Sequence, residues 1–341
     1  MHVLPILSTL RRHRTAAALI VLEIAFTCAI VCNAIFLIGE RLARMDQPSG
    51  VAEDELIRVQ VTGTGKEADA MAVTAQDLGS LRAIPGVRSA AVTSSVPFDD
   101  WSGNSPVSTI SGDPAPPFNA GIYLGSADLL ETLGVRLTSG RDFDPEEYVD
   151  LPLEHGRPQL RAAPSVIITR GLAEALFPGE SPLGRPLYVL ILGEEPLTIV
   201  GVIERLARAD YEDARAGAAY AFVLPMNVPN FAGMSYLLRV DPARRAEVLA
   251  AVDAALDEVD PSRVILARQT FAEIRRNFFR QDRAMAYLLT GVSLGLLVIT
   301  ALGIVGLASS WVQQRTRQIG IRRALGATRG DILRYFQVEN F

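Results

Sequence analysis

Two long apolar runs divide the chain into three parts. The first run extends from Thr15 to Ile38, and the second from Ala284 to Trp311. A helix rises about 1.5 Å per residue, so the first run would be about 36 Å long, more than a hydrocarbon core of about 30 Å. The second run is longer still. Both runs are therefore predicted to be transmembrane helices.

A secretory signal peptide is the alternative for the first run. Its apolar region would be only about 7–15 residues long and would precede a cleavage site of small residues. The run from Thr15 is longer, which favours a membrane span. Glu23 and Asn33 interrupt it, and a carboxylate costs about 2.5–3.5 kcal/mol at the bilayer centre. Glu23 is expected either to face another helix or to lie near the interface, and the sequence leaves both open.

Arginines flank both predicted spans on one side. Arg11, Arg12 and Arg14 precede the first span, and a larger set follows the second: Arg315, Arg317, Arg322, Arg323, Arg329 and Arg334. Basic residues are retained on the cytoplasmic side. Residues 1–14 and 312–341 are thus predicted to be cytoplasmic, and residues 39–282 to lie outside a bacterial inner membrane, in the periplasm of a Gram-negative cell.

The region between the spans alternates between strand and helix patterns, in an order that occurs twice. The first occurrence predicts a strand at 55–61, a helix at 74–83 with Thr74 as N-cap, and a strand at 87–93. The second predicts a strand at 236–240, a helix at 242–259 and a strand at 263–267. Two β-α-β units in one domain predict a split ferredoxin-like fold of the α+β class.

A second unit is expected between these halves. Its predicted elements are strands at 122–124 and 165–169, helices at 126–133 and 171–177, and a strand pair at 187–192 and 197–203. Segments 95–117 and 144–164 are rich in proline and polar residues and are predicted to be loops.

One continuous helix is predicted from Thr270 to Trp311, about 60 Å long. Its outer part would form a stalk, and we expect such a helix to carry rigid-body motion across the membrane. Gly291, Gly295 and Gly303 lie on one stripe of this helix, where small residues allow helices to approach closely. The match to Gly-x-Ser-x-Gly at 291–295 lies within the membrane span and is not a hydrolase elbow.

Charge and lysine content narrow the function further. The net charge is −5, with basic residues at the two ends and acidic residues in the middle, which excludes a nucleic-acid-binding face there. Lys66 is the only lysine and precedes Glu67, so it cannot complete a Walker A loop. Any ATP must therefore bind a partner. Cys28 and Cys32 are expected to pack as small hydrophobes in a core.

No catalytic, cofactor or metal site is predicted. Acidic pairs in two loops are interpreted as solvated charges rather than general acids and bases: Asp99 and Asp100, and Asp210, Glu212 and Asp213. The histidines, at positions 2, 13 and 155, lack the spacing of metal ligands. We therefore expect a protein that is not itself an enzyme.

The segment from Gln314 to Leu333, QRTRQIGIRRALGATRGDIL, resembles the cytoplasmic signature of MacB/FtsX-like ABC transporter permeases. Segments 134–144, 176–184 and 199–203 resemble the periplasmic core domain of the same family. The resemblance covers nearly the whole chain. It implies a MacB-like core domain with porter-like parts at about 50–110 and 205–270 and an inserted subdomain at about 118–204.

The resemblance also implies a mechanism and partners. Such permeases act by mechanotransmission, in which a cytoplasmic ABC ATPase that binds ATP and Mg²⁺ moves the periplasmic domain, here for export or efflux. A second permease in a homo- or heterodimer and a periplasmic adaptor or effector are further expected partners, besides the lipid bilayer. The residues expected to couple to the ATPase are Arg315, Arg317, Gly320, Arg322, Arg323, Gly326 and Arg329. Alternatively, these arginines only fix the topology.

Thr328 and Asp331 match a capping box, so a new helix is predicted to begin there. The family has four spans, and this chain stops at Phe341, where a third would begin. We expect either a fragment or a shortened gene. Two other functions stay open: a scaffold of the FtsX type that activates a cell-wall hydrolase, and a two-span ligand sensor, although no signalling module follows Trp311. The sequence does not identify the substrate.

Overall fold

The computed structural model describes residues 14–62, 70–99, 103–151, 153–154, 157–158, 160, 163–208, 219–229 and 234–314, with single positions between 320 and 332. The chain forms two compact units. The helical unit consists of Met1–Asp46 and Gln281–Phe341, and the α+β domain consists of Gln47–Arg280.

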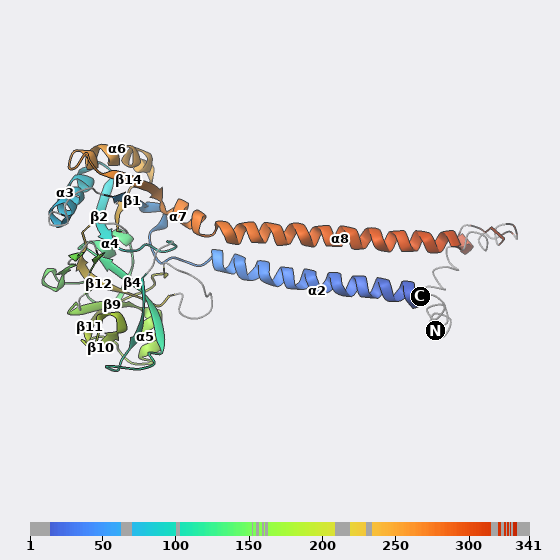
Figure 1. Cartoon of the computed structure of the whole chain (residues 1–341), viewed down its shortest axis with the longest axis horizontal. Helices are drawn as coiled ribbons and strands as arrows, with labels where there is room; N and C mark the ends of the chain where they lie inside the picture. Colours follow the sequence, from blue (N-terminus) through green and yellow to red (C-terminus); the bar gives the residue numbers. More distant parts are fainter. Residues whose placement is uncertain are drawn as a thin grey trace. The chain divides into compact units, whose positions relative to one another are not determined.

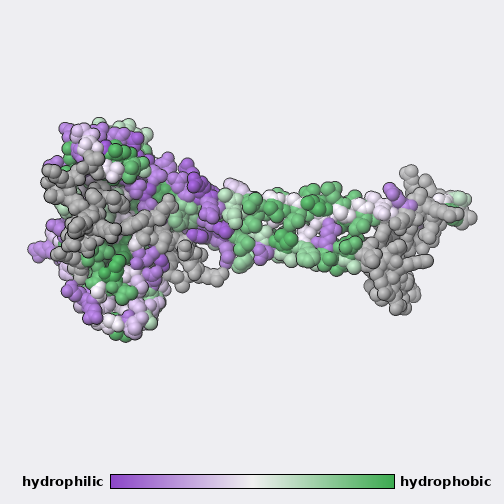
Figure 2. Space-filling model, viewed as in Figure 1, coloured by the Kyte–Doolittle hydropathy of each residue, from purple (hydrophilic) through white to green (hydrophobic). Residues whose placement is uncertain are grey.

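Two long helices make up the described part of the helical unit: α2 (Arg14–Met45) and α8 (Arg280–Gln314). Ala18–Met45 and Arg280–Leu307 are each long and apolar enough to cross a membrane, with mean hydropathies of 2.3 and 2.4. Only 11% and 6% of these windows are buried, whereas a core helix of a soluble protein would be mostly buried. Hydrophobic side chains cover both helices in Figure 2, as expected for helices in contact with lipid.

One part of the α+β domain has the predicted ferredoxin-like order. The first β-α-β unit comprises β1 (Leu56–Thr62), α3 (Ala70–Ala83) and β2 (Val87–Thr93). The second comprises β13 (Ser235–Val240), α6 (Arg245–Asp257) and β14 (Val264–Thr270). The strand order is β14-β1-β13-β2, and every neighbouring pair is antiparallel. This confirms the split ferredoxin-like fold, with α3 and α6 close together in Figure 1.

The rest of the domain is a closed ring of strands. Its longer strands are β3 (Gly103–Ser108), β4 (Phe118–Gly125), β9 (Ser165–Thr169), β10 (Pro186–Val189), β11 (Leu197–Ile203) and β12 (Ala221–Asn227). Hydrogen-bonded neighbours follow the order β4-β3-β10-β11-β9-β12, and β12 pairs again with β4. These six strands therefore form a small barrel, with side chains filling its interior.

Short elements complete both parts of the domain. They are the helices α4 (Leu129–Leu133) and α5 (Arg170–Leu176), the strands β5 (Leu137–Gly140), β6 (Val149–Asp150), β7 (Leu153–Glu154) and β8 (Arg157–Pro158), and 3-10 turns at Pro145–Glu147 and Leu190–Leu192. Further 3-10 turns at Glu53–Glu55 and Pro242–Arg244 precede β1 and α6.

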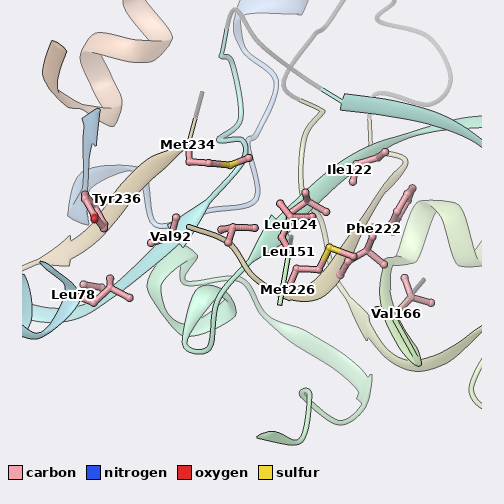
Figure 3. Close-up of a cluster of buried hydrophobic side chains, with 14 of the residues drawn as sticks. Leu78, Val92, Ile122, Leu124, Leu151, Val166, Phe222, Met226, Met234 and Tyr236 are labelled. Carbon is pink, nitrogen blue, oxygen red and sulfur yellow. The ribbon is translucent and has the colours of Figure 1, made fainter. Parts of the chain in front are cut away.

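A single hydrophobic cluster extends through both parts of the domain. Leu78, Val92 and Tyr236 belong to the ferredoxin-like part, while Ile122 and Phe222 belong to the barrel (Figure 3). Buried apolar surface of this extent is the main source of folding free energy. The two parts therefore share a core and form one domain.

One buried ion pair lies beside this core. Arg263 Nη1 is 2.6 Å from Asp77 Oδ2, and the side chains are only 3% and 2% exposed. The hydroxyl of Tyr236 also donates to Asp77. Buried charges are tolerated when they are paired and hydrogen-bonded, so this triad joins α3 to β13 and to the turn before β14.

Several expected elements were wrong in detail. Thr74 is not an N-cap: α3 begins at Ala70, and Thr74 Oγ1 donates to the Ala70 carbonyl at 2.6 Å. The segments expected to be loops contain β3 and β6 to β8. The helix expected at 126–133 begins only at Leu129, because Asp128 has a φ of +67° and cannot continue a helix.

The single helix expected from Thr270 to Trp311 was also wrong. The structure has α7 (Phe271–Phe278) and then α8 from Arg280. Phe279 separates them, with φ −86° and ψ 14°. Neither proline nor glycine lies at this position, and the Phe279 ring is almost fully buried.

Candidate functional site

Polar contacts connect α2 and α8 along their antiparallel interface (Figure 1). Thr27 Oγ1 lies 2.7 Å from Thr300 Oγ1. A Cβ atom on Gly303 would lie 2.7 Å from Glu23 Oε1, so glycine leaves room for the carboxyl group. Of the two positions left open for Glu23, the structure therefore has the one that faces another helix. Side-chain hydrogen bonds between helices are a common source of association in membranes.

The other two glycines of the predicted stripe lie elsewhere. A Cβ atom on Gly291 or Gly295 would meet nothing within 4 Å. A role for these two residues in packing against another helix stays a prediction. Cys28 and Cys32 are exposed on α2, so the expectation that they pack in a core was wrong.

An ion-pair cluster lies at the end of α2 and the start of α8. Asp282 Oδ1 is 2.6 Å from Arg41 Nη1 and 3.8 Å from Arg44 Nη1. The Asp282 side chain is only 8% exposed. Arg41 and Arg44 share a helix face because they are three positions apart. We call these three residues the Asp282 clamp.

In the α+β domain, α7 begins with a capping box. Glu273 N donates to Thr270 Oγ1 at 3.3 Å, and Thr270 N donates to Glu273 Oε2 at 2.8 Å. Phe271 and Ile274 are buried on the inner face of this short helix. The cap and the apolar face together fix where α7 starts and how it lies on the domain.

Arg275 lies on α7 and contacts the segment where the domain begins. Its Nη2 donates to the Gln47 carbonyl at 2.7 Å, and its Nη1 lies 2.5 Å from Glu53 Oε1. Its guanidinium carbon is 4.8 Å from the centroid of the Phe98 ring, a cation–π distance. One side chain thus joins the first residues of the domain to its last helix. We call Arg275, Gln47 and Glu53 the Arg275 clamp.

Phe98 lies beneath α7 in a strained conformation. Its φ is +64°, in the left-handed region that favours glycine. The ring is 1% exposed and lies 6.1, 5.7 and 5.2 Å from the ring centroids of Phe271, Phe278 and Phe279. Such strain persists where surrounding contacts determine the backbone. Bonds between Ser94 and Leu124, each 3.0 Å, fix the loop that carries Phe98 to β4.

Asp99 is not the solvated loop charge that the sequence indicated. Its Oδ2 lies 2.6 Å from Arg58 Nη1, and the side chains are 13% and 8% exposed. Arg58 also donates to Gln269 at 2.6 Å. This pair holds the Phe98 loop against β1 and β14. Asp100, Asp210, Glu212, Asp213 and the three histidines lie outside the described residues.

The segment expected to contact an ATPase is described only in part. Gly320 and Gly326 are exposed, and Gly326 has a φ of +94°, which a glycine adopts readily. The remaining predicted coupling residues lie outside the described residues: Arg315, Arg317, Arg322, Arg323 and Arg329. Their role stays a prediction.

The predicted capping box in this segment is confirmed. Asp331 N donates to Thr328 Oγ1 at 3.3 Å, and Thr328 N donates to Asp331 Oδ2 at 3.1 Å. The hydrogen bond from the Thr328 hydroxyl lowers the pKa of Asp331. A helical turn therefore begins here, as the sequence indicated.

No group of three or more metal-ligating side chains occurs among the described residues. A cleft of about 570 Å³ in the α+β domain is lined by residues that include Arg136, Arg170, Arg205, Glu174 and Glu204. Arg136 and Arg170 lie 2.5 and 3.9 Å from Glu204, so these charges largely satisfy one another.

Sequence reasoning missed both clamps. Thr270 and Glu273 have the same spacing as Thr328 and Asp331, so the start of α7 could have been found from that signal. The contact between Arg275 and Gln47 joins positions 228 residues apart, and no local pattern reports such a pair.

Comparisons with known proteins match most of the chain. The family model for the MacB-like periplasmic core domain matches residues 17–259, and that for the FtsX-like permease C-terminal region matches residues 290–341. A macrolide export ATP-binding/permease protein MacB from Agrobacterium fabrum is 27% identical over 228 residues, covering 65% of this chain and 32% of that protein. MacB 1 from Aeromonas hydrophila is 29% identical over 222 residues, covering 62% and 31%.

The chain thus spans about a third of the length of the curated relatives it matches. Two solved structures are also similar. The extracellular domain of the noncanonic ABC-type transporter YknZ from Gram-positive bacteria has 14% identity and a TM-score of 0.38, covering 62% of this chain and 100% of that one. The periplasmic region of MacB from Actinobacillus actinomycetemcomitans has 12% identity and a TM-score of 0.40, covering 69% and 97%.

Proposed function

The chain belongs to the family of MacB/FtsX-like ABC transporter permeases, and on that premise we propose that it couples ATP hydrolysis in a partner ATPase to movement of its α+β domain. The observation that carries this proposal is the order of the two family matches. A match to the periplasmic core domain is followed by a match to an FtsX-like permease region, which begins within the second candidate span.

The geometry supports mechanical work rather than a substrate channel through these two helices. Both chain connections of the α+β domain lead to a candidate span. The Arg275 clamp fastens the first residues of the domain to its last helix, so a displacement of either span would act on the same place. An export or efflux role is part of this proposal.

The family and the composition both support an ATP-binding partner. Lys66, the only lysine of this sequence, does not complete a Walker A loop. The curated relatives are described as ATP-binding/permease proteins, and the match to this chain covers about a third of them. We propose that ATP and Mg²⁺ bind a separate cytoplasmic ABC ATPase, and that two permeases associate in the membrane.

We further propose that the spans lie in a bacterial inner membrane with residues 1–14 and 312–341 in the cytoplasm. Arginines flank both spans on that side. Reporter fusions at Ser111 test this orientation. Alkaline phosphatase is expected to be active there and a cytoplasm-dependent reporter inactive, and the reverse pattern would contradict the orientation.

Co-purification with an ABC ATPase tests the coupling. The chain would be co-expressed with the ATPase encoded nearest to it and purified in mild detergent. We expect the ATPase to be retained, and the replacement of Arg322 and Arg323 by alanine to release it. Replacement of the remote Arg136 and Arg170 by alanine is the matched control, because it removes the same charge from the α+β domain.

Other outcomes would identify other functions. Recovery of a cell-wall hydrolase bound to the α+β domain would favour a scaffold of the FtsX type. Failure to retain any ABC ATPase, with the protein folded and in the membrane, would contradict the proposal and leave the ligand sensor as the better interpretation.

A further inference from the structure

A cleft of about 170 Å³ lies on the barrel where β3 pairs with β10, and we call it the β3–β10 cleft. Successive side chains of a strand point to opposite faces of the sheet. Val107 and Val189 are paired and fully buried in the core. Pro106, Tyr188 and Leu190, which alternate with them, line the cleft instead. Apolar residues thus occupy positions that are usually polar on the outer face of a sheet.

Exposed hydrophobic side chains gather around the β3–β10 cleft. In the described part of the α+β domain, six large hydrophobic side chains are exposed: Ile110, Leu137, Leu190, Ile191, Val264 and Leu266. Three of the six are here, because Ile110 and Leu190 line the cleft and Ile191 follows Leu190. They are 65%, 59% and 54% exposed. Single exposed hydrophobic residues are common, whereas a group of them marks a surface that binds another molecule.

The connection from β3 to β4 contributes part of the cleft and is held in a defined conformation. Asp113 accepts hydrogen bonds from the Ser108 hydroxyl at 2.6 Å and from Ala115 N at 3.0 Å. Prolines at positions 114, 116 and 117 further restrict this backbone. A preformed surface lowers the entropic cost of binding, so the cleft can receive a ligand without rearrangement of this connection.

Both charged side chains that line the cleft are acidic. The Ser108 hydroxyl and the Ala115 N–H lower the pKa of Asp113, so this carboxylate stays charged. Glu194 comes from the connection between β10 and β11, and its Oε1 lies 3.9 Å from the position that a Cβ atom on Gly112 would take. No basic residue is among the described residues that line the cleft. A complementary ligand therefore carries a positive charge.

The volume of the cleft indicates one inserted side chain rather than a whole small molecule. Sites for drug-sized ligands have volumes of about 300–1,000 Å³, whereas this cleft has about 170 Å³. Only a longer segment would also cover the exposed Ile191 beside it. Arginine is the cation that protein interfaces favour, because its guanidinium group pairs with carboxylates and stacks on aromatic rings such as that of Tyr188.

We propose that the β3–β10 cleft is a docking site for another protein, which inserts an arginine side chain beside Asp113 and Glu194 and places an aliphatic side chain on Leu190 and Ile191. Charge and apolar surface select this segment together. An acidic segment would be repelled, and a wholly polar one would leave the hydrophobic side chains in water. The proposal goes beyond the proposed coupling to an ATPase and does not rest on it.

Peptide binding to the full chain tests the proposal. The chain would be reconstituted in nanodiscs of phosphatidylcholine, a lipid without net charge, and empty nanodiscs would serve as the blank. The probes are fluorescent hexapeptides, blocked at both ends, with the central pairs Arg-Leu, Glu-Leu and Arg-Ser. Fluorescence anisotropy is expected to show that Arg-Leu binds at least about fivefold more tightly than Glu-Leu and about threefold more tightly than Arg-Ser.

Variants of the chain test whether the peptides bind in the cleft. Glu194→Gln is expected to weaken Arg-Leu binding at least about threefold, because it removes one carboxylate. Ile191→Ser is expected to remove the preference for Arg-Leu over Arg-Ser. Glu258→Gln and Leu266→Ser are the matched controls, because both residues are exposed in the ferredoxin-like part and lie outside the cleft. Neither control is expected to change the affinity of any peptide.

Two results of the peptide measurements would overturn the proposal. Equal affinities for Arg-Leu and Glu-Leu, or no binding of any peptide up to about 1 mM, would show that the cleft does not select a basic segment. Equal losses in Glu194→Gln and Glu258→Gln would show that the peptides bind elsewhere. These measurements need neither nucleotide nor an ATPase, so failure here is distinguishable from failure of the proposed coupling.

A second copy of this chain is the remaining occupant, and disulfide crosslinking tests it. With Cys28 and Cys32 replaced by alanine, the chain would carry either Ile191→Cys or, as the matched control, Leu266→Cys. We expect oxidation in the membrane to link copies of neither variant more than the other. Linked copies with Ile191→Cys and not with Leu266→Cys would show that a second copy covers the cleft and would overturn the proposal.

Discussion

The α+β domain and the helical unit differ in where they place their apolar side chains. In the domain, apolar side chains such as Tyr236 and Phe222 fill a core. In α2 and α8, apolar side chains face outward, and polar ones such as Thr27 and Asp282 lie at the helix interface. The difference indicates that water determines the packing of the domain, whereas lipid determines that of the helices. Stability should therefore depend on different residues in the two units.

The largest loss of stability is expected when the buried Asp77–Arg263 ion pair of the domain is broken. Asp77→Ala would leave Arg263 charged and without its partner in the core, which destabilises the domain by about 3–5 kcal/mol. Chemical unfolding of the full chain in detergent, followed by near-ultraviolet circular dichroism, measures the loss. The double change Asp77→Ala with Arg263→Met is expected to recover most of it. A loss below about 1 kcal/mol in the single variant would contradict this account.

The next largest loss of stability is expected at Phe98, where the usual order of alanine and glycine should be reversed. Phe98→Ala removes a buried ring and is expected to cost about 3 kcal/mol. Phe98→Gly removes the same ring but relieves the positive φ, which is worth about 1 kcal/mol. Glycine should therefore be less destabilising than alanine here, although it is usually the more destabilising residue. Denaturation midpoints of the two variants decide the order, and the reverse order would show that the backbone is unstrained.

A third prediction concerns the helical unit. Gly303→Val would bring a side chain against the Glu23 carboxyl group, with an expected overpacking cost of about 1–3 kcal/mol. Gly295→Val is the matched control, because nothing lies within 4 Å of a Cβ atom there. Thermal aggregation in a fixed detergent measures both. Equal effects at the two positions would mean that α2 and α8 do not meet at Gly303 in the membrane.

The smallest expected effect is pH-dependent and belongs to the surface of the domain. Two hydrogen bonds from Arg141, of 2.7 and 2.9 Å, lower the pKa of Glu147 from 4.5 to about 2. The pair therefore stabilises the folded state above pH 4.5, and this stabilisation is lost as the pH falls from 4.5 towards 2. Glu147→Gln should cost at most about 1 kcal/mol at pH 7.

The stability difference between the original and Glu147→Gln proteins should shrink as the pH falls towards 2. Thermal midpoints of the original and Glu147→Gln proteins, measured between pH 7 and pH 3, are expected to converge on acidification. A constant difference across this range would show that the carboxylate charge contributes nothing. Glu146→Gln serves as the control, because Glu146 is exposed on the same turn and is not a member of the Arg141–Glu147 pair.

Local patterns predicted much of the fold. The strands at 87–93 and 165–169 were predicted with their observed bounds, because β-branched and apolar residues form short runs there. The ring of six strands was missed, because β3 and β12 contain Pro106 and Pro225. Proline within a run argues against a strand, and here long-range pairing overrides that tendency.

The candidate site was predicted less well than the fold. The capping box at Thr328 follows from two residues three positions apart. No local pattern marks the interruption at Phe279, whose ring packs against Phe98, a residue distant in sequence. Nothing in the local sequence marks Arg275, and its contacts with Gln47 and Glu53 join it to residues far away along the chain. Contacts between distant segments cannot be predicted from the periodic pattern of hydrophobic residues.

The closed ring of strands in the domain has a consequence for how a pull would be distributed. Every strand of the ring is bonded on both sides, so sliding any one of them requires two ladders to break at once. The ring is joined to the ferredoxin-like sheet at one register pair, Thr93 with Gly125, and the bonds beside it. A pull on the domain would therefore be resisted at this junction by few ladder bonds and by the hydrophobic core that the two parts share.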